Sequence, residues 1–161
     1  MESGTITSII MLVLMFAFIL TFVRWMSLKR VNRFLKPLQS LAKETNSIIT
    51  DYAIWNNNII GHDKNTHHVF FIKTTEEKQT QQTIALSSVQ KCHINNSSRS
   101  AINNQSIIEK LELVFTERGK NGTEISLEFY NAKHDNLTIN EELQLIQKWS
   151  GIINDQLKTI N

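Results

Sequence analysis

Residues 5–23 read TITSIIMLVLMFAFILTFV, an almost unbroken apolar run that divides the chain into an anchor and a globular remainder. Nineteen residues at the helical rise of ~1.5 Å span roughly 29 Å, about the hydrocarbon thickness of a bilayer. The few hydroxyl side chains in the run can donate back to carbonyls of their own helix. The run therefore predicts a transmembrane helix over residues 5–23, preceded by a short extracytoplasmic N-terminus of residues 1–4.

The flanks of this run favour a retained anchor over a cleaved secretory signal. Residues 1–4 contain no Lys or Arg, whereas a signal peptide begins with a positively charged region. Arg24, Trp25 and Met26 follow the run, and they do not resemble a small-residue cleavage site. A buried core helix would usually be shorter or carry a polar stripe, which this run lacks.

Basic residues are concentrated directly after the run, and no Asp or Glu occurs between Arg24 and Lys43. Cytoplasmic flanks of membrane helices accumulate Lys and Arg in this way. We therefore expect a single-pass protein of the cell inner membrane, with its N-terminus outside and the rest in the cytoplasm. The residues expected to contact the membrane surface are Arg24, Trp25, Lys29, Arg30, Arg33 and Lys36. They can hold anionic headgroups, or act only as a stop signal without lipid selectivity.

Residues 24–50 are expected to form a basic juxtamembrane helix. Apolar residues recur at spacings of three and four, opposite the basic ones, which is the pattern of an amphipathic helix. Proline removes a backbone donor and clashes with the preceding turn, so Pro37 is expected to kink this helix or divide it in two. The apolar residues are Val31, Phe34, Leu35, Leu38 and Leu41.

The charge of the chain is unevenly distributed. The formal net charge is +2, but residues 44–161 hold 11 basic and 14 acidic residues. A mildly acidic domain argues against nucleic acid as a partner, because phosphate contacts need a concentrated basic face. About 110 residues, 51–161, remain for one domain with a single modest core. The only cysteine, Cys92, cannot form an internal disulfide, which agrees with a reducing compartment.

Alternating, β-branched and aromatic segments predict an antiparallel sheet after residue 51. Short strands are expected at residues 52–55, 59–61, 68–73, 83–86 and 89–94. The polar stretches 74–82 and 95–106 are expected to be loops, the second of them mobile. The clearest element is an antiparallel hairpin over residues 110–129, in which Leu113 and Phe115 share an apolar face with Leu127 and Phe129.

The chain ends in a predicted amphipathic helix. Thr138 with Glu141 matches a capping box, and Trp149 lies in the apolar stripe of the helix that follows. Strands followed by one such helix predict an α+β fold, in which the helix closes a strongly bent sheet. The residues expected to form the core are Leu113, Phe115, Leu127, Phe129 and Trp149.

This order of elements resembles bacterial pleckstrin-homology-like (PH-like) domains with an N-terminal membrane anchor. The resemblance rests on the strand of residues 125–130, the helix of residues 141–157, and the stretches 59–63 and 84–92. It covers about residues 51–159 and consists of patterns of hydrophobicity and length. It implies a split barrel of about seven strands capped by the C-terminal helix, with a role in binding or scaffolding and no catalysis.

The sequence departs from the PH domains that bind phosphoinositides, which the resemblance associates with a basic loop between the first two strands. Residues 56–58 are three uncharged asparagines, and the turn of residues 62–67 holds only Lys64 beside Asp63. We therefore do not expect phosphoinositide binding.

Other chemical sites receive little support. His67 and His68 are adjacent, so they would point to opposite faces of a strand and could not easily share a metal ion. His62 and Asp63 are expected in a solvated turn, as are His134 and Asp135. Cys92 is expected to be a buried thiol packed as a small hydrophobe.

The sequence therefore predicts a membrane-anchored scaffold or adaptor without enzymatic activity, cofactor or metal. The module would bind a protein partner or itself at the bilayer to which residues 5–23 attach it. The alternative is a sensor of lipid or of a small ligand at the inner leaflet. The identity of the partner is not encoded in any motif.

Overall fold

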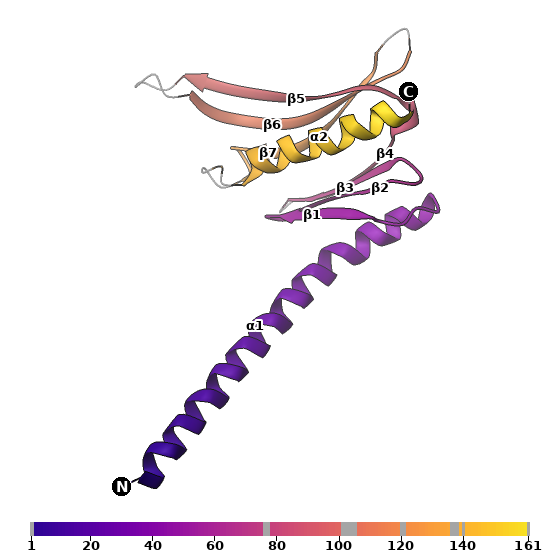
Figure 1. Cartoon of the computed structure of the whole chain (residues 1–161). Coiled ribbons are helices and arrows are strands. Elements are labelled where there is room, and N and C mark those ends of the chain that lie inside the picture. Colours follow the sequence, from indigo (N-terminus) through magenta and orange to yellow (C-terminus); the bar gives the residue numbers. More distant parts are fainter. Residues whose placement is uncertain are drawn as a thin grey trace. The chain divides into compact units, whose positions relative to one another are not determined.

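The computed structural model describes residues 2–75, 78–100, 106–119, 122–135, 139 and 141–160 (Figure 1). The chain forms two compact units, Met1–Pro37 and Leu38–Asn161. The α+β class is confirmed, because a long apolar helix precedes seven antiparallel strands and a C-terminal helix in the described part of the chain.

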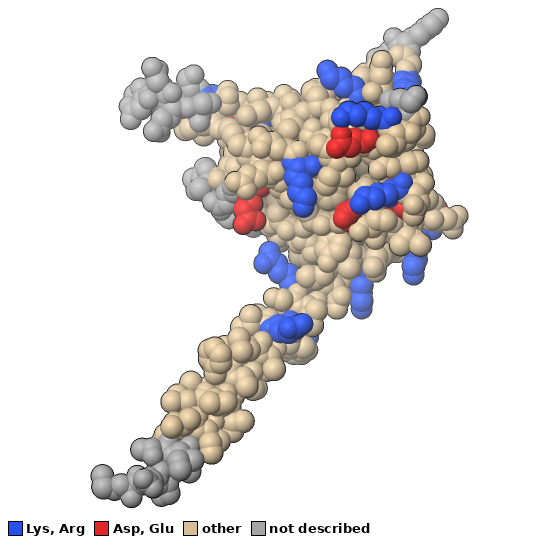
Figure 2. Space-filling view, in the orientation of Figure 1, with Lys and Arg blue, Asp and Glu red and all other residues tan. Residues whose placement is uncertain are grey.

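The first unit is formed by helix α1 (Glu2–Glu44), which continues beyond the unit boundary. An 18-residue window of this helix has a mean hydropathy of 2.4, and none of that window is buried. The helix is thus long and apolar enough to cross a membrane, a property that signal sequences share. Thr21 Oγ1 donates to the carbonyls of Ala17 and Phe18, at 3.0 and 2.9 Å, so this hydroxyl is satisfied within its own helix. On the face that Figure 2 shows, the described part of the apolar segment is uncharged.

Helix α1 is continuous through Pro37, so of the two predicted effects of this proline the division of the helix does not occur, and the kink stays a prediction. The predicted juxtamembrane helix also ends earlier than residue 50. Asn46 adopts a left-handed conformation (φ 53°), its N–H donates to Lys43, and the N–H of Ser47 donates to Ala42. These two hydrogen bonds form a Schellman motif, which satisfies carbonyls at the end of the helix and redirects the chain.

The second unit contains two antiparallel sheets rather than one bent sheet. The first has the order β1-β2-β3-β4 and the second the order β5-β6-β7, which leaves no closed barrel among the described strands. The strands are β1 (Asp51–Trp55), β2 (Asn58–Asp63), β3 (His68–Thr74), β4 (Gln79–Ala85), β5 (Val89–Ser100), β6 (Ser106–Glu117) and β7 (Glu124–Asn131). A short 3-10 turn, η1 (Leu86–Ser88), joins the sheets.

Two of the loop predictions are wrong, because both stretches contain paired strands. The polar stretch 74–82 contains most of β4, whose seven residues pair with β3 in an unbroken register. The expected mobile loop of residues 95–106 is largely paired as well, since β5 extends to Ser100 and β6 begins at Ser106. Residues 101–105 lie outside the described residues.

The predicted hairpin is confirmed as the antiparallel pair β6 and β7. Its inner face carries Leu113, Phe115, Leu127 and Phe129, each of which is fully buried. Gly122 has a left-handed φ of 48° near the turn, while Asn121, the other half of the expected Asn-Gly turn, lies outside the described residues.

Helix α2 (Glu142–Ile160) packs on the second sheet and contributes Ile146, Trp149, Ile153 and Leu157 to the core. Its predicted capping residue Thr138 lies outside the described residues. Asn154 Nδ2 donates to the carbonyl of Cys92 at 3.1 Å, which attaches the helix to β5. The indole of Trp55 donates to the carbonyl of Phe129 at 3.0 Å and joins the two sheets within the core.

The four-stranded sheet is covered on both faces at its two central strands, β2 and β3. Its inner face gives Trp55, Ile60, Val69 and Phe71 to the shared core. Residues of the opposite face, among them Ile59, Phe70 and Ile72, are also buried. The final turns of α1 pack on this face at Gly61. The contact is so close that a Cβ added to Gly61 would lie only 2.7 Å from Leu38 Cδ2.

Candidate binding cleft

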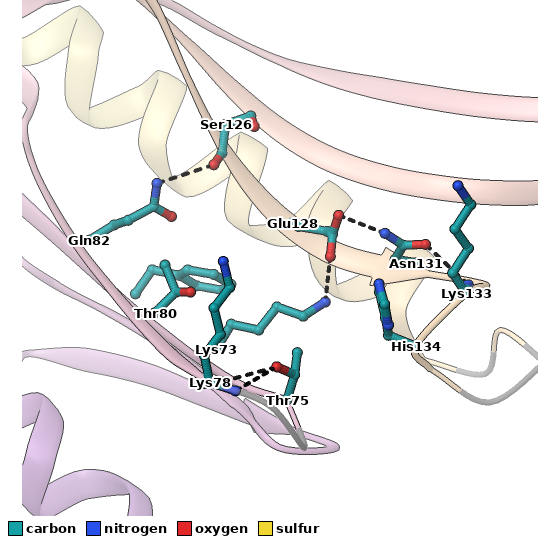
Figure 3. A pocket seen from close by; sticks show the side chains of 11 residues that line it. Lys73, Thr75, Lys78, Thr80, Gln82, Ser126, Glu128, Asn131, Lys133 and His134 are labelled. Carbon is teal, nitrogen blue, oxygen red and sulfur yellow. Dashed lines mark hydrogen bonds and ion pairs between the residues drawn. The ribbon is translucent and has the colours of Figure 1, made fainter.

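A cleft of about 510 Å³ lies where the two sheets separate (Figure 3). One wall comes from β3, β4 and their turn, and the other from β7 and the turn that follows it. Most of the lining side chains are polar. The residues are Phe71, Lys73, Thr75, Lys78, Thr80, Gln82, Ser126, Glu128, Asn131, Lys133 and His134.

Lys73 is buried between the two walls and holds them together. Its side chain is 8% exposed, and Nζ lies 2.8 Å from Glu128 Oε1 and 3.5 Å from Asp135 Oδ2. Lys73 is the continuation of the inner face of β3 beyond Phe71, so its long stem extends the core while its amine reaches the far wall. An ammonium group buried to this extent needs such paired carboxylates.

Glu128 connects this ion pair to a second one on the outer face of the second sheet. Lys110 Nζ lies 3.4 Å from Glu128 and 2.7 Å from Glu112. Partial burial alone would raise the pKa of Glu128, but hydrogen bonds from Lys73 and Asn131 outweigh it, so the pKa is lowered. The hydrogen bond to Glu112 likewise raises the pKa of Lys110. Each group is therefore held in its charged form.

The two turns at the cleft are fixed by local hydrogen bonds. Asp135 accepts the N–H of Asn131 at 2.7 Å, and the Asn131 side chain accepts the N–H of Lys133 at 3.1 Å. On the opposite wall, Thr75 Oγ1 donates to the carbonyl of Lys78 at 3.0 Å. The Asn131–Lys133 bond is an Asx turn, and side-chain bonds of these kinds fix the backbone without a strand partner.

The cleft separates two sheet edges, β4 and β7, that share no ladder of backbone hydrogen bonds. Gln82 Nε2 donates to the carbonyl of Ser126 across the gap at 3.4 Å, a long hydrogen bond from a side chain. The cleft can therefore admit an extended segment or a small ligand beside either edge.

His62 and Asp63, which were expected in a solvated turn, are instead buried at the end of β2. Burial would raise the pKa of Asp63, but the backbone N–H groups of Ile48 and Asn65 bind its carboxylate and lower that pKa. Asp63 thereby fixes the segment that leaves α1. These contacts identify a structural carboxylate rather than a reactive one.

Cys92 is buried, as the sequence predicted. Desolvation raises the pKa of its thiol to about 12. The thiolate is the nucleophilic form of cysteine, so this side chain is unreactive at neutral pH. The described residues contain no group of three or more His, Cys, Asp or Glu side chains placed to hold a metal ion.

The residues predicted to contact a membrane surface all lie exposed on α1 and take no part in the cleft. They are Arg24, Trp25, Lys29, Arg30, Arg33 and Lys36. Lys29 Nζ lies 3.4 Å from the centre of the Trp25 ring, a cation–π contact. The predicted core residue Trp149 is 1% exposed and lies in the same buried cluster as the four hairpin residues.

Sequence reasoning did not find the cleft or its ion pairs. Lys73 and Asp135 are far apart in the sequence, and Asp135 was expected to be solvated, whereas its side chain is only 13% exposed. The sequence did contain one indication, which was Lys73 itself. It falls at an alternating position with the buried residues of its strand, and a lysine buried there needs an acidic partner. Comparison with family models, with curated proteins and with solved structures finds no match to this chain.

Proposed function

We propose that this chain is a single-pass membrane protein that presents a PH-like module to the cytoplasm as a non-enzymatic adaptor. The module would bind a partner protein, or a second copy of itself, at the membrane surface. The observation that carries this proposal is an unburied apolar helix of membrane-spanning length attached to a compact module that has a cleft and unpaired sheet edges.

Three features support a PH-like module. Seven strands are divided four and three between two antiparallel sheets, and one amphipathic helix follows the last strand. That helix packs on the second sheet and contributes Trp149 to the shared core. The resemblance implied about seven strands capped by a C-terminal helix, and these features support that part of it.

The chemistry of the cleft supports binding rather than catalysis. Lys73 and Glu128, the ion pair that bridges its two walls, neutralise one another at 2.8 Å. A catalytic acid or base needs a pKa near the working pH, whereas the pKa of Glu128 is lowered. The burial of Cys92 likewise argues against a thiol nucleophile.

The adaptor would benefit directly from its anchor. Fixing a module to a surface raises its effective concentration toward partners on that surface without any new contact. The basic residues after the apolar run support a cytoplasmic location for the module, following the positive-inside rule.

A small-ligand or lipid sensor is the second candidate, and the cleft itself favours it. Its volume of about 510 Å³ falls within the roughly 300–1,000 Å³ of small-molecule sites. The polar lining would suit a charged or hydroxylated ligand.

Topology can be tested with the full chain in intact cells. A cysteine introduced at exposed Thr159 should resist a membrane-impermeant thiol reagent until the cells are opened, and the chain should stay in membranes after alkaline extraction. Native Cys92 is buried and serves as the silent background. Labelling of Thr159→Cys in intact cells, or release of the chain into the soluble fraction, would contradict the proposal.

The two candidate functions can be separated with purified full-length protein. An adaptor should be recovered from gently solubilised membranes with a protein at fixed stoichiometry, whether a partner or a second copy. A sensor should instead bind added anionic vesicles through its module and retain that binding at high salt. If the chain is recovered without any bound protein and binds such vesicles, the adaptor proposal is wrong and the sensor is supported.

A further inference from the structure

We propose that β4 is a self-association edge, through which two copies of the chain pair their β4 strands antiparallel into one continuous sheet. This inference rests on the proposed adaptor function and identifies a second copy of the chain as its partner. The strand runs from Gln79 to Ala85 and pairs only with β3 among the described residues.

β4 differs from the other three edge strands in its chemistry. Each of the others carries charge, with Asp51 in β1, Lys91 in β5 and Glu124 in β7. The sequence of β4, QTQQTIA, has no charged residue and no proline. Charges, prolines and bulges are the usual protection of an edge strand against pairing with another chain.

β4 is also geometrically regular and accessible. Its register with β3 is unbroken over seven pairs, whereas the ladders of the second sheet contain irregularities. Gln79, Gln81 and Thr83 are exposed. The cleft lies along this edge, so the neighbouring β7 does not pair with it. A second strand therefore finds a regular edge that has no ladder partner among the described strands.

The composition of β4 favours a second copy as the occupant. Because the strand is uncharged, antiparallel self-pairing places no like charges opposite one another, which would be destabilising. Threonine and glutamine side chains can instead hydrogen bond across the strands. Anchoring both copies in one membrane would raise their effective concentration.

Symmetry makes the geometry specific. A two-fold axis perpendicular to the continuous sheet places one residue of β4 directly opposite its own copy, because facing residues must point to the same side. The pairing uses the β4 edge of both chains, so it closes as a dimer and does not propagate into a fibre.

Cross-linking of the full chain in its membrane tests this arrangement. Single cysteines are introduced at Thr80, Gln81, Gln82 and Thr83 and oxidised, with Gln147→Cys on the exposed face of α2 as the matched control. We expect disulfide-linked dimers to peak at one β4 position, several-fold above the control, and to fall at the adjacent positions. Equal yields at β4 and at residue 147 would overturn the proposal, as would a ladder of higher oligomers.

Charge insertion provides a second measurement that does not depend on cysteines. The variant Gln81→Lys with Thr83→Lys places like charges across the paired edge, and it should be monomeric in detergent by light scattering. Gln147→Lys should remain dimeric. A dimer that survives the β4 lysines would overturn the inference, while a monomeric wild-type chain that is still retained in membranes would overturn self-pairing and leave the anchored adaptor intact.

Discussion

His62 and Trp149 meet edge to face in the core, with ring centroids 5.8 Å apart and ring planes at 89°. His62 lies on β2 and Trp149 on α2, so this contact joins the first sheet to the C-terminal helix. Neither ring nitrogen of His62 has a hydrogen-bond partner among the described residues. An imidazole in this position is stable only while it is neutral.

Acidification should therefore destabilise the module through His62. Desolvation lowers the pKa of His62 below its ordinary value of 6.5, although nearby Asp51 opposes the shift. As the pH falls through about 6.5, the unfolded chain binds a proton that the folded protein does not, so stability decreases. Urea unfolding should show this loss between about pH 7 and pH 5.

The variant His62→Phe keeps an aromatic ring but cannot be protonated, so its stability should depend less on pH in this window. Replacing the exposed His134 with Gln is the control and should leave the pH dependence of the wild-type chain unchanged. If the stability of His62→Phe and of the wild type depended on pH in the same way, His62 would not be the cause of the acid destabilisation.

Lys73 should contribute more to stability than a surface lysine with an equally short ion pair. Lys73→Met leaves Asp135 without this cation and Glu128 with only its longer contact to Lys110. We expect a loss of about 2 kcal/mol, below the full cost for a completely buried pair. Lys64 lies 2.8 Å from Asp51, but both side chains are exposed. Lys64→Met should therefore cost less than about 1 kcal/mol.

The two lysine variants can be compared by urea unfolding of the full chain in detergent, followed by tryptophan fluorescence. Equal losses for Lys73→Met and Lys64→Met would show that burial of the cleft pair does not matter. The double variant Lys73→Met with Glu128→Gln should recover part of the loss, because one of the two carboxylates that lost Lys73 is then removed.

Two glycine-to-alanine substitutions should have opposite effects. A Cβ on Gly61 would meet Leu38, Ile49 and the backbone of Asp51 within 3.3 Å, so Gly61→Ala should cost about 1–3 kcal/mol through overpacking. Gly151 lies exposed in α2 with no atom near its would-be Cβ. Gly151→Ala should stabilise the chain by about 0.5–1 kcal/mol through helix propensity. Thermal unfolding of both variants checks whether the first lowers and the second raises the stability. If Gly61→Ala left the stability unchanged, the end of α1 could move aside to make room for the added methyl group.

The basic segment should determine the orientation in the membrane. Replacing Arg24, Lys29 and Arg30 with Gln removes half of the positive charge between residues 24 and 43. The orientation bias should weaken as a result, so some copies would expose Thr159→Cys to an impermeant reagent in intact cells. A uniform orientation in this variant would indicate that other features orient the chain.

The elements with strong periodicity could be predicted from the sequence. The β6–β7 hairpin alternates apolar and polar residues, and α2 repeats its apolar residues every three or four positions, so each pattern reveals its buried face. The first part of β4, residues 79–82, escaped prediction because an edge strand with a solvent-exposed face contains few apolar residues. The distal part of β5 escaped for the same reason, since its pairing with β6 depends on the partner strand rather than on its own composition.

The cleft depended on information that local patterns do not contain. Lys73 and Glu128 belong to different sheets, and their ion pair forms only when those sheets pack. His62 and Asp63 were expected in solvent because polar residues near a turn usually are. They are buried because α2 covers one of these positions and the segment after α1 covers the other, and neither neighbour is close in sequence.

Every residue of β2 is buried, so both faces of this strand are covered, and it lies between β1 and β3. Its amide protons should consequently be among the last in the module to exchange with deuterium, because releasing them requires the sheet to come apart. The amides on the open side of β4 should exchange early in an isolated chain and slow markedly when a second strand docks there. Exchange rates across this one sheet would thus distinguish β2, whose amides stay protected, from β4, whose protection would depend on a docked strand.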